Sequence, residues 1–266
     1  MAEKSRIRIV LIGSGNVSWH LGFAFRNAGL EIVQLRNRSS DSGQALANDL
    51  GTIFISDFQK ELPTCEFVVV AVRDSILATV LNSIRCAGAV VLHTSGTQGL
   101  DIFPEHLKKC GILYPLQTLT KGVQVDLRRS PLLIEASDEK TVSQVKDLAG
   151  RISEIVHVMS TEQRRVLHIS GIFINNFTNH MVARAFDFLD SNKLDRSLLL
   201  PLFEETINKL ELVSPYEAQT GPARRNDLET IRRHIEILSG NPQMKKLYRL
   251  MTDSIIAYYS KLDKSI

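Results

Sequence analysis

Residues 6–38, RIRIVLIGSGNVSWHLGFAFRNAGLEIVQLRNR, decide the fold of this chain. An apolar run over 7–12 ends in the turn GSG at 13–15, an amphipathic stretch follows, and a second apolar run ends at Arg36. Short apolar runs bounded by turn residues predict strands, and the helical periodicity between them predicts a helix. The stretch therefore predicts a strand, a glycine turn, a helix and a second strand.

The glycine turn indicates a binding site for a dinucleotide. Gly13 permits the sharp exit from the strand, and Gly15 lacks the Cβ that would keep a pyrophosphate away from the backbone. The N–H groups and the dipole at the start of the following helix attract the same phosphates. The third small position is Ser18, which still allows close packing of helix on strand. The alternative is an ordinary tight turn without a ligand. The expected cofactor contacts at the strand ends are Gly13, Ser14, Gly15, Asn16, Val17, Ala71 and Val72.

The end of the second strand predicts which dinucleotide is bound. An NAD site usually places an acidic residue about 20 residues past the glycines, where it binds the ribose 2′-hydroxyl. This chain has Arg36, Asn37, Arg38 and Ser39 there, and its first acid is Asp41. Arginines and hydroxyls bind the 2′-phosphate that a carboxylate would repel. We therefore expect NADP(H), with contacts from residues 36–39; the alternative is that the arginines belong to a solvated strand end.

The composition is that of a globular protein. The 266 residues suffice for one large domain or two ordinary ones, with 44% hydrophobic and 23% charged residues. The net charge is 32 − 29 = +3, and no dense basic run is interleaved with aromatics, so we expect no nucleic-acid partner.

Cysteine usage and hydropathy favour a cytoplasmic protein. The three cysteines are odd in number and widely separated, which is typical of reduced thiols rather than of a disulfide framework. No apolar stretch approaches the ~20 residues of a membrane span. The first strand begins almost at the N-terminus, so we also expect no signal peptide. No clustering of residues suggests a metal site.

Alternating strands and helices in the first half predict an α/β fold, a Rossmann domain with a doubly wound parallel sheet. Helical periodicity alone follows from Ser160 onward, which predicts a dinucleotide-binding domain over 1–158 and an all-helical domain over 159–266. The expected strands are 7–12, 31–36, 52–55, 66–72, 89–93, 111–114, 131–134 and 155–158. The expected helices are 16–29, 40–50, 74–85, 138–150, 160–189, 196–212, 226–239 and 242–262.

Polar residues at other strand ends are candidates for a substrate site, because ligands of open α/β sheets bind at the carboxyl ends of the strands. Thr94 and Ser95 follow the strand at 89–93, and their hydroxyls could hold a carbonyl or carboxylate. Gln117 follows the next strand and could line the same region. Ordinary polar turns are the alternative. We expect Asp74 only to cap the helix behind it.

The predicted helix over 160–189 is apolar nearly all round, which is typical of a buried helix. It nevertheless carries His168, Asn175, Asn176, Asn179 and His180. By the 3.6-residue repeat, His168 and Asn176 are neighbours on this helix. Histidine suits proton transfer near neutral pH. We therefore expect His168 and Asn176 to be catalytic together with Ser95; satisfied polar groups of a core are the alternative.

The segment TGPARRND at 220–227 is the last candidate. Its Gly-Pro pair predicts a bend, and we expect Asn226 to cap the following helix. Arg225 could bind a substrate anion, or it could form a local ion pair with Asp227.

Taken together, these motifs resemble the superfamily of 6-phosphogluconate and β-hydroxyacid dehydrogenases, to which pyrroline-carboxylate reductase and deazaflavin-dependent NADP oxidoreductase are related. The chain is most similar to a branch of Rossmann-like proteins, provisionally assigned as NADP oxidoreductases, whose C-terminal domain has no known function. The motifs of that branch are HTSG at 93–96, YPLQ at 114–117, NFTNH at 176–180 with His168, and GPARRND at 221–227. The resemblance covers nearly the whole chain.

The resemblance implies NADPH-linked hydride transfer and a homodimer built through the helical domain. One departure concerns the proton donor, since β-hydroxyacid dehydrogenases carry a lysine one turn before an asparagine. Aligning that asparagine with Asn176 puts Ile172 at the lysine position. We therefore expect His168 to take the lysine's place.

Two functions fit these features. The first is an oxidoreductase that moves a hydride between NADP(H) and a small carbonyl or hydroxy, or imine or amine, substrate in an interdomain cleft. The second is a protein that senses NADPH without chemistry, which the missing lysine favours and the polar cluster of the apolar helix disfavours.

Overall fold

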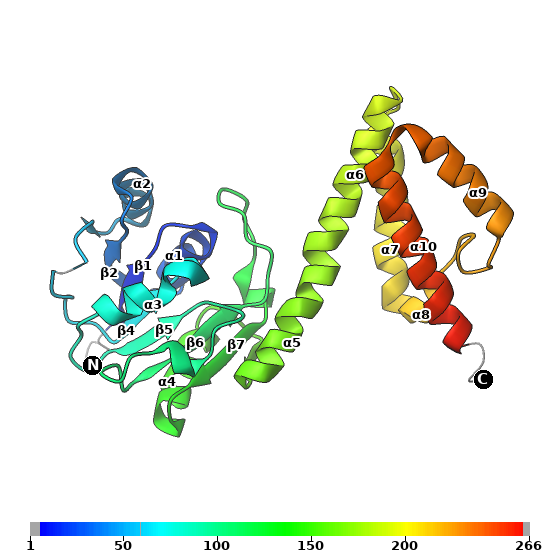
Figure 1. Ribbon diagram of the computed structural model, residues 1–266. Helices are drawn as coiled ribbons and strands as arrows, with labels where there is room; N and C mark the ends of the chain where they lie inside the picture. Colours follow the sequence, from blue (N-terminus) through cyan, green and yellow to red (C-terminus); the bar gives the residue numbers. More distant parts are fainter. Residues whose placement is uncertain (1–5, 59, 263–266) are drawn as a thin grey trace. The chain divides into compact units, whose positions relative to one another are not determined.

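A computed structural model describes residues 6–58 and 60–262 of the chain. The chain packs into two compact units, one reaching to Asn176 and the other beginning at Phe177. Strands and helices alternate through most of the first unit, and the second is helical (Figure 1). Each unit is described by itself below.

The first unit is built on one sheet whose strand order is β3-β2-β1-β4-β5-β6-β7-β8. Its strands are β1 (Arg8–Ile12), β2 (Glu31–Arg36), β3 (Phe54–Ile55), β4 (Phe67–Val70), β5 (Val90–His93), β6 (Cys110–Pro115), β7 (Leu132–Ala136) and β8 (Val156–Val158). The order reverses between β1 and β4, which pair in parallel from Ile9 opposite Phe67 to Ile12 opposite Val70. The predicted Rossmann fold is confirmed, and its switch point lies at the end of β1.

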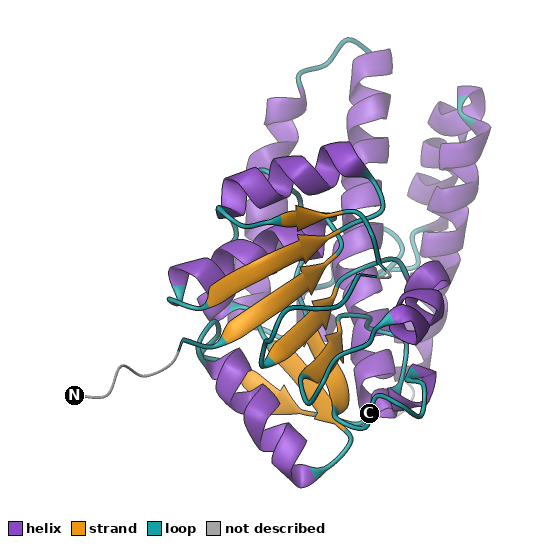
Figure 2. Cartoon of the chain, turned by 90° about the vertical axis from the view of Figure 1, so that its left-hand side faces the viewer, coloured by secondary structure: helices purple, strands orange, loops and turns teal. Residues whose placement is uncertain are grey.

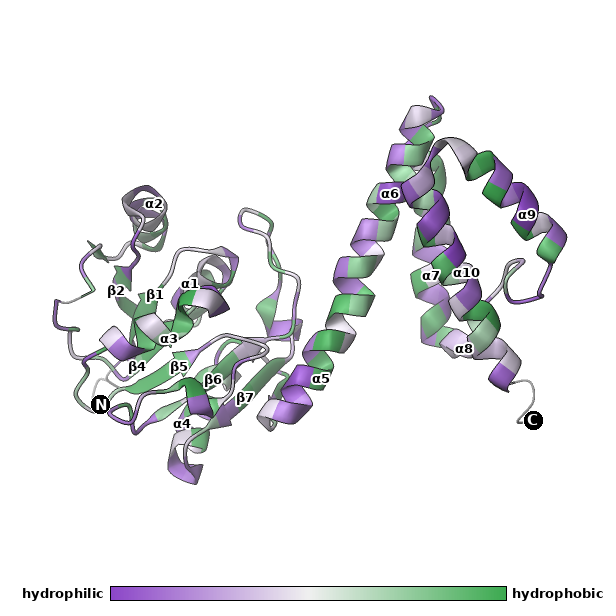
Figure 3. Cartoon of the chain, in the orientation of Figure 1, coloured by the Kyte–Doolittle hydropathy of each residue, from purple (hydrophilic) through white to green (hydrophobic). Residues whose placement is uncertain are grey.

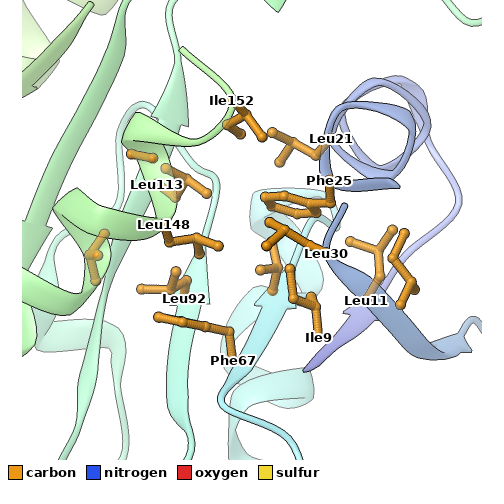
Figure 4. Close-up of a cluster of buried hydrophobic side chains, with 14 of the residues drawn as sticks. Ile9, Leu11, Leu21, Phe25, Leu30, Phe67, Leu92, Leu113, Leu148 and Ile152 are labelled. Carbon is orange, nitrogen blue, oxygen red and sulfur yellow. The ribbon is translucent and has the colours of Figure 1, made fainter. Parts of the chain in front are cut away.

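Alternate residues of the central strands face two separate hydrophobic cores, so helices cover both faces of the sheet (Figure 2). On one face Ile9, Leu11 and Phe67 pack with Leu21 and Phe25 of α1 (Asn16–Asn27) (Figure 4). Helices α2 (Ser40–Leu50) and α4 (Glu139–Gly150) add their buried residues to this core. On the other face the strands pack against α3 (Asp74–Ser83). Burial on both faces explains why these strands read as continuous apolar runs.

Two strands run opposite to the other strands of the sheet, because β7 pairs antiparallel with β6 and β8 pairs parallel with β7. The connection from β6 to β7 contains only a 3₁₀ turn, Leu127–Arg129. A parallel crossover passes over a sheet face, usually through an α-helix; the link over 116–131 contains no α-helix and returns antiparallel.

The helix that begins after the sheet is continuous but not uniform. It runs as α5 (Thr161–Gly171), a π-helical segment (Ile172–Phe177) and α6 (Thr178–Ser191). Ser160 and Gln163 form the predicted capping box, each side chain accepting from the other's backbone N–H. α5 belongs to the first unit. The 3.6-residue repeat used to relate His168 to Asn176 does not hold across the π segment, because π-helical bonds span five residues.

The prediction that this helix is buried is wrong for the single chain. Ile174 is 77% exposed and Val166 is 65% exposed, and Ile169, Phe173 and Phe177 are also more than half exposed. Figure 3 shows hydrophobic residues along the helix. The polar residues Asn175, Asn176, Asn179 and His180 are exposed as well.

The second unit continues with α7 (Leu200–Leu212), α8 (Pro215–Ala218), α9 (Leu228–Ile237) and α10 (Pro242–Leu262). Asn241 caps α10 through Met244, but Asn226 does not cap α9. Asp227 is the cap, accepting from the N–H and hydroxyl of Thr230, and Asn226 has a positive φ of 54°. Within residues 6–58 and 60–262, no helix combines the length and apolar composition needed to cross a bilayer.

Candidate functional site

The glycine turn lies at the carboxyl end of β1, against the ends of β2 and β4. Gly13 has a φ of 112°, and a Cβ there would lie 2.2 Å from the carbonyl oxygen of Ala71. Its N–H donates to the carbonyl of Arg36 over 2.8 Å. Ser18 is fully buried beneath the turn and donates to the same Ala71 carbonyl over 3.3 Å. Gly13 and Ser18 therefore let α1 approach the two central strands closely.

The space above the turn is open to a ligand. A Cβ on Gly15 would meet no atom within 4 Å, and no side chain caps the first turn of α1, which Gly15 precedes. The first N–H groups of a helix have no partner within the helix, so they are available to an anion. No acidic residue stands in that first turn. The side-chain oxygen of Asn16 instead accepts the backbone N–H of Lys121 over 3.2 Å.

Three polar side chains link the turn to the end of β2. The hydroxyls of Ser14 and Ser42 are 2.9 Å apart, and the amide of Asn37 donates to Ser42 over 3.2 Å and to the carbonyl of Ser39 over 2.8 Å. The structure thus brings together the predicted cofactor residues of two strand ends and adds Ser42, which our sequence reasoning missed. Ser42 follows a predicted helix start by two residues, and nothing in the local sequence distinguishes it.

The two arginines at this strand end differ. Arg36 is only 2% exposed, and its guanidinium donates to Gln34 over 2.8 Å and to the carbonyls of Glu61 and Phe58 over 2.7 and 3.5 Å. Burial lowers the pKa of Arg36, and Asp57 opposes this. Its guanidinium therefore fixes the chain beyond β3. Arg38 is exposed, so it is the arginine free to meet a phosphate from solvent.

The loop after β5 is held from the side of α3. The hydroxyl of Ser95 donates to Asp74 over 2.9 Å and accepts the backbone N–H groups of Thr97 and Gln98, each over 3.1 Å. A hydroxyl offers one donor and two acceptor sites, so Ser95 has used all three. The hydroxyl of Thr97 also donates to Asp74, over 2.6 Å. The expectation that Asp74 caps α3 is corrected, because its carboxylate holds this loop instead.

His93 ends β5 beneath that loop. It is fully buried, stacks on Phe103 with ring centroids 5.2 Å apart, and accepts the N–H of Ser95 on Nδ1 over 3.2 Å. Burial lowers the pKa of His93 to about 4; the carbonyl of Gly99, 3.4 Å from Nε2, opposes the shift. A neutral imidazole with an acceptor at Nδ1 therefore shapes the loop.

His168 lies on α5 against the ends of β5 and β6. Its Nδ1 is 2.9 Å from the hydroxyl of Tyr114, within hydrogen-bond distance, and the two rings meet edge to face. A Cβ on Gly96 would lie 2.6 Å from this Nδ1 and 3.0 Å from Cζ of Tyr114. Gly96 thus leaves room for the pair. Burial raises the pKa of Tyr114, so its hydroxyl keeps its proton at neutral pH.

Tyr114 is the second residue that our candidate set omitted. Its signal was present in the sequence, since it opens the YPLQ motif at the end of a predicted strand. In the same motif, the exposed Gln117 is bound to Ser130 over 3.1 Å and to the N–H of Thr118 over 2.8 Å. Thr94 is buried next to Ser95. Tyr114 therefore places a second proton-bearing group beside His168, whereas the sequence analysis had named His168 alone.

Three candidates remain, one in the π-helical segment and two in the second unit. Asn176 lies in the π-helical segment and is exposed. Arg225 is exposed in the second unit. Asp227 is committed to Thr230, whose hydrogen bonds lower the pKa of Asp227, with a smaller contribution from Arg225. The second unit thus gives Asp227 a capping role at α9.

Two family models cover most of the chain. A Rossmann-like domain matches residues 2–118, and a domain of unknown function, DUF2520, matches residues 130–255. The comparison with curated proteins found no match.

Solved structures share this architecture over nearly the whole chain. A provisionally assigned NADP oxidoreductase from Bacteroides fragilis is 34% identical, with a TM-score of 0.88, covering 95% of this chain and 98% of that one. A protein from Thermotoga maritima is 21% identical, with a TM-score of 0.70 and coverages of 96% and 99%. A pyrroline carboxylate reductase from Plasmodium falciparum, solved with NADP bound, is 13% identical, with a TM-score of 0.59 and coverages of 95% and 98%. The last two likenesses concern the fold alone.

Proposed function

This chain belongs to the family of Rossmann-like proteins with a DUF2520 C-terminal domain, and we propose that it is an NADP(H)-dependent oxidoreductase. One observation carries the proposal: the turn at the switch point is built for a close-lying phosphate. The carbonyl of Ala71 excludes a Cβ at position 13, so this residue must be glycine. Gly15 faces open space, and no side chain caps the start of α1. The relative from Bacteroides fragilis, named as an NADP oxidoreductase, supports the same function.

The residues around the turn fit NADP(H). The uncapped N–H groups of α1 would hold the pyrophosphate, and Arg38 with the hydroxyls of Ser39 and Ser42 would hold the 2′-phosphate. Asn37 orients Ser42 for this purpose. We assign Arg36 a supporting role, because its guanidinium is spent on Gln34 and two carbonyls. Bound NADPH supplies the hydride.

His168 handles the proton in this proposal. As an imidazolium it donates from Nε2 to the oxygen or nitrogen of a small carbonyl or imine substrate, while Nδ1–H donates to the hydroxyl of Tyr114. The substrate carbon gains the hydride, the heteroatom gains the proton, and the imidazole is left neutral. Tyr114 remains protonated throughout, since burial raises its pKa. Asn176 orients the substrate, and Ser95 shapes the loop beside it.

Binding measurements test the cofactor. Calorimetry should show NADPH binding at least tenfold more tightly than NADH. Arg38→Gln should weaken NADPH about tenfold, or ~1.4 kcal/mol for one charged hydrogen bond, and leave NADH unchanged. Arg6→Gln is the matched control, an exposed arginine before the amino end of β1. Equal affinities for the two cofactors would contradict the assignment of the 2′-phosphate site.

Turnover measurements test the chemistry. A screen of carbonyl and imine compounds with NADPH should find a substrate whose reduction His168→Ala slows by at least a hundredfold, in the range of general acid catalysis. Unchanged turnover in that variant would remove His168 from the mechanism. NADPH binding without turnover of any compound would favour a sensor, for which Ile172 at the position of the family lysine is the supporting observation.

A second copy of the chain would cover the exposed apolar residues of the long helix. Val166, Ile169, Phe173 and Ile174 form a large exposed apolar set, which is unusual for a monomer. Sedimentation should therefore show a homodimer, and Ile174→Lys should dissociate it. A monomeric wild type at micromolar concentration would contradict this part of the proposal.

A further inference from the structure

Side chains of α5 contact three consecutive residues of the loop after β5. His168 lies against Gly96, the side chain of Arg165 donates to the carbonyl of Thr97 over 2.7 Å, and the side chain of Arg164 donates to the carbonyl of Gln98 over 2.5 Å. Residues three and four apart share one face of a helix, so Arg164 and His168 contact the loop from the same face of α5. The position of α5 on the sheet is therefore defined by this loop.

Arg164 is the buried centre of these contacts. Its side chain is 1% exposed, and it donates to Oε2 of Glu135 on β7 over 2.5 Å. Thr161, one turn earlier, donates to the same carboxylate oxygen over 2.7 Å. Among the described residues, Nε of Arg164 has no hydrogen-bond partner. A buried ion pair is a poor source of stability, since desolvation offsets its attraction. Its better-attested use is to fix one arrangement of packed elements.

The charge of Arg164 is also felt at the candidate site. His168 of α5 lies within hydrogen-bond distance of Tyr114 of β6, and the positive charge of Arg164 opposes the rise in the pKa of Tyr114 that burial causes. The same charge contributes to keeping His93 neutral, against the carboxylates of Asp74 and Glu135. Arg164 thus acts on the pair both by position and by charge.

We propose that Arg164, held by Glu135, is a positioning residue that sets the contact between His168 and Tyr114. The inference rests on the proposed function for its catalytic meaning, but the contact itself exists in the protein without cofactor. Without Arg164, α5 would lose its bond to Gln98 and its ion pair with Glu135 of β7, and Thr161 would still donate to that carboxylate. The ring of His168 would then no longer be held at the hydroxyl of Tyr114.

The test removes both charges together, because one alone would leave an unpaired buried charge. In the double variant R164M/E135Q, the glutamine still accepts from Thr161, which favours a folded protein. The control is Arg128→Met, which breaks the exposed ion pair between Arg128 and Glu154, both about two-thirds exposed. Tyrosine labelled at Cζ with ¹³C reports the titration of Tyr114, and Tyr114→Phe assigns its resonance.

We expect R164M/E135Q to bind NADPH within twofold of wild type. Its Tyr114 titration should move upward by at least half a pH unit, and its turnover should fall at least tenfold. Arg128→Met should change none of these quantities. Wild-type titration and turnover in a folded double variant would overturn the inference.

Should the double variant not fold, Arg164→Lys decides the question. A lysine keeps the charge but cannot reach Glu135 and Gln98 with two arms of one planar fork. A folded Arg164→Lys protein with an unchanged Tyr114 resonance would equally overturn the inference; a shifted resonance supports it. Failure of the proposed function is a separate outcome, because it would appear as absent NADPH binding in the wild type while the Tyr114 titration still responded to Arg164.

Discussion

Gly13→Ala should lower the stability of the protein, whereas Gly15→Ala should lower its affinity for NADPH, although a single residue separates the two glycines. At Gly13 the added Cβ would lie 2.2 Å from the oxygen and 2.9 Å from the carbon of the Ala71 carbonyl, in a backbone with a φ of 112°. Both contacts are with backbone, so no side-chain rotation relieves them. At Gly15 the Cβ would meet nothing within 4 Å, and the φ of −78° suits alanine.

The expected magnitudes follow from these geometries. Strain at a positive φ costs roughly 1–3 kcal/mol, and overpacking a close contact costs about as much again. Gly13→Ala should therefore lower the free energy of unfolding by at least ~2 kcal/mol, which lowers Tm by about 4–8 °C in a chain of this size. Gly15→Ala should leave Tm within about 1 °C, because its strain and contact terms are both absent.

NADPH affinity should reveal the effect of Gly15→Ala, which Tm does not. A methyl group on Gly15 stands where a pyrophosphate approaches the start of α1, so Gly15→Ala should weaken NADPH at least tenfold in calorimetry, or ~1.4 kcal/mol. Scanning calorimetry supplies Tm for both variants. A wild-type Tm for Gly13→Ala, or an unchanged NADPH affinity for Gly15→Ala, would contradict these expectations.

Three further predictions concern the loop after β5 and the thiols. Because burial lowers the pKa of His93 to about 4 from 6.5, the free energy of unfolding should fall by up to about 3 kcal/mol between pH 6.5 and pH 4. In urea titrations, His93→Gln should lose less unfolding free energy than the wild type between pH 6.5 and pH 4. The same pH dependence in both proteins would contradict this prediction. Gly96→Ala should push the ring of His168 from Tyr114, lowering turnover at least tenfold while calorimetric NADPH affinity stays within twofold. Burial raises the pKa of Cys65 to about 11, so iodoacetamide at pH 8 should label it far more slowly in the folded protein than in urea.

The parts of the fold that were predictable from sequence depend on local signals. Apolar runs of strand length, the glycine turn and the capping box at Ser160 each depend on residues a few positions apart. The prediction of a buried long helix used a local signal as well, but its outcome depends on what covers the apolar residues. The sequence indicates that a residue such as Ile174 is apolar, but it does not indicate whether that residue lies in a core or at an interface between two copies.

The candidate site was less predictable because its contacts join distant parts of the chain. Arg164 reaches Gln98 and Glu135, which precede it by 66 and 29 residues. The saturation of Ser95 likewise depends on Asp74, 21 residues earlier. Residue type suggested that Ser95 was free for a substrate, but only the folded arrangement reveals that its hydroxyl is already used.

The difference between Arg36 and Arg38 is a case in which the sequence held more than residue type. Side chains two apart on a strand lie on the same face, which would make Gln34 and Arg36 neighbours within β2. They are, with Nε of Arg36 donating to Gln34 over 2.8 Å, and that bond draws the guanidinium into the protein. Arg38 lies beyond the last strand residue and escapes this alternation. The end of β2 at Arg36 therefore separates an arginine that supports the site from one that can meet a phosphate, whereas residue type alone treats the two arginines alike.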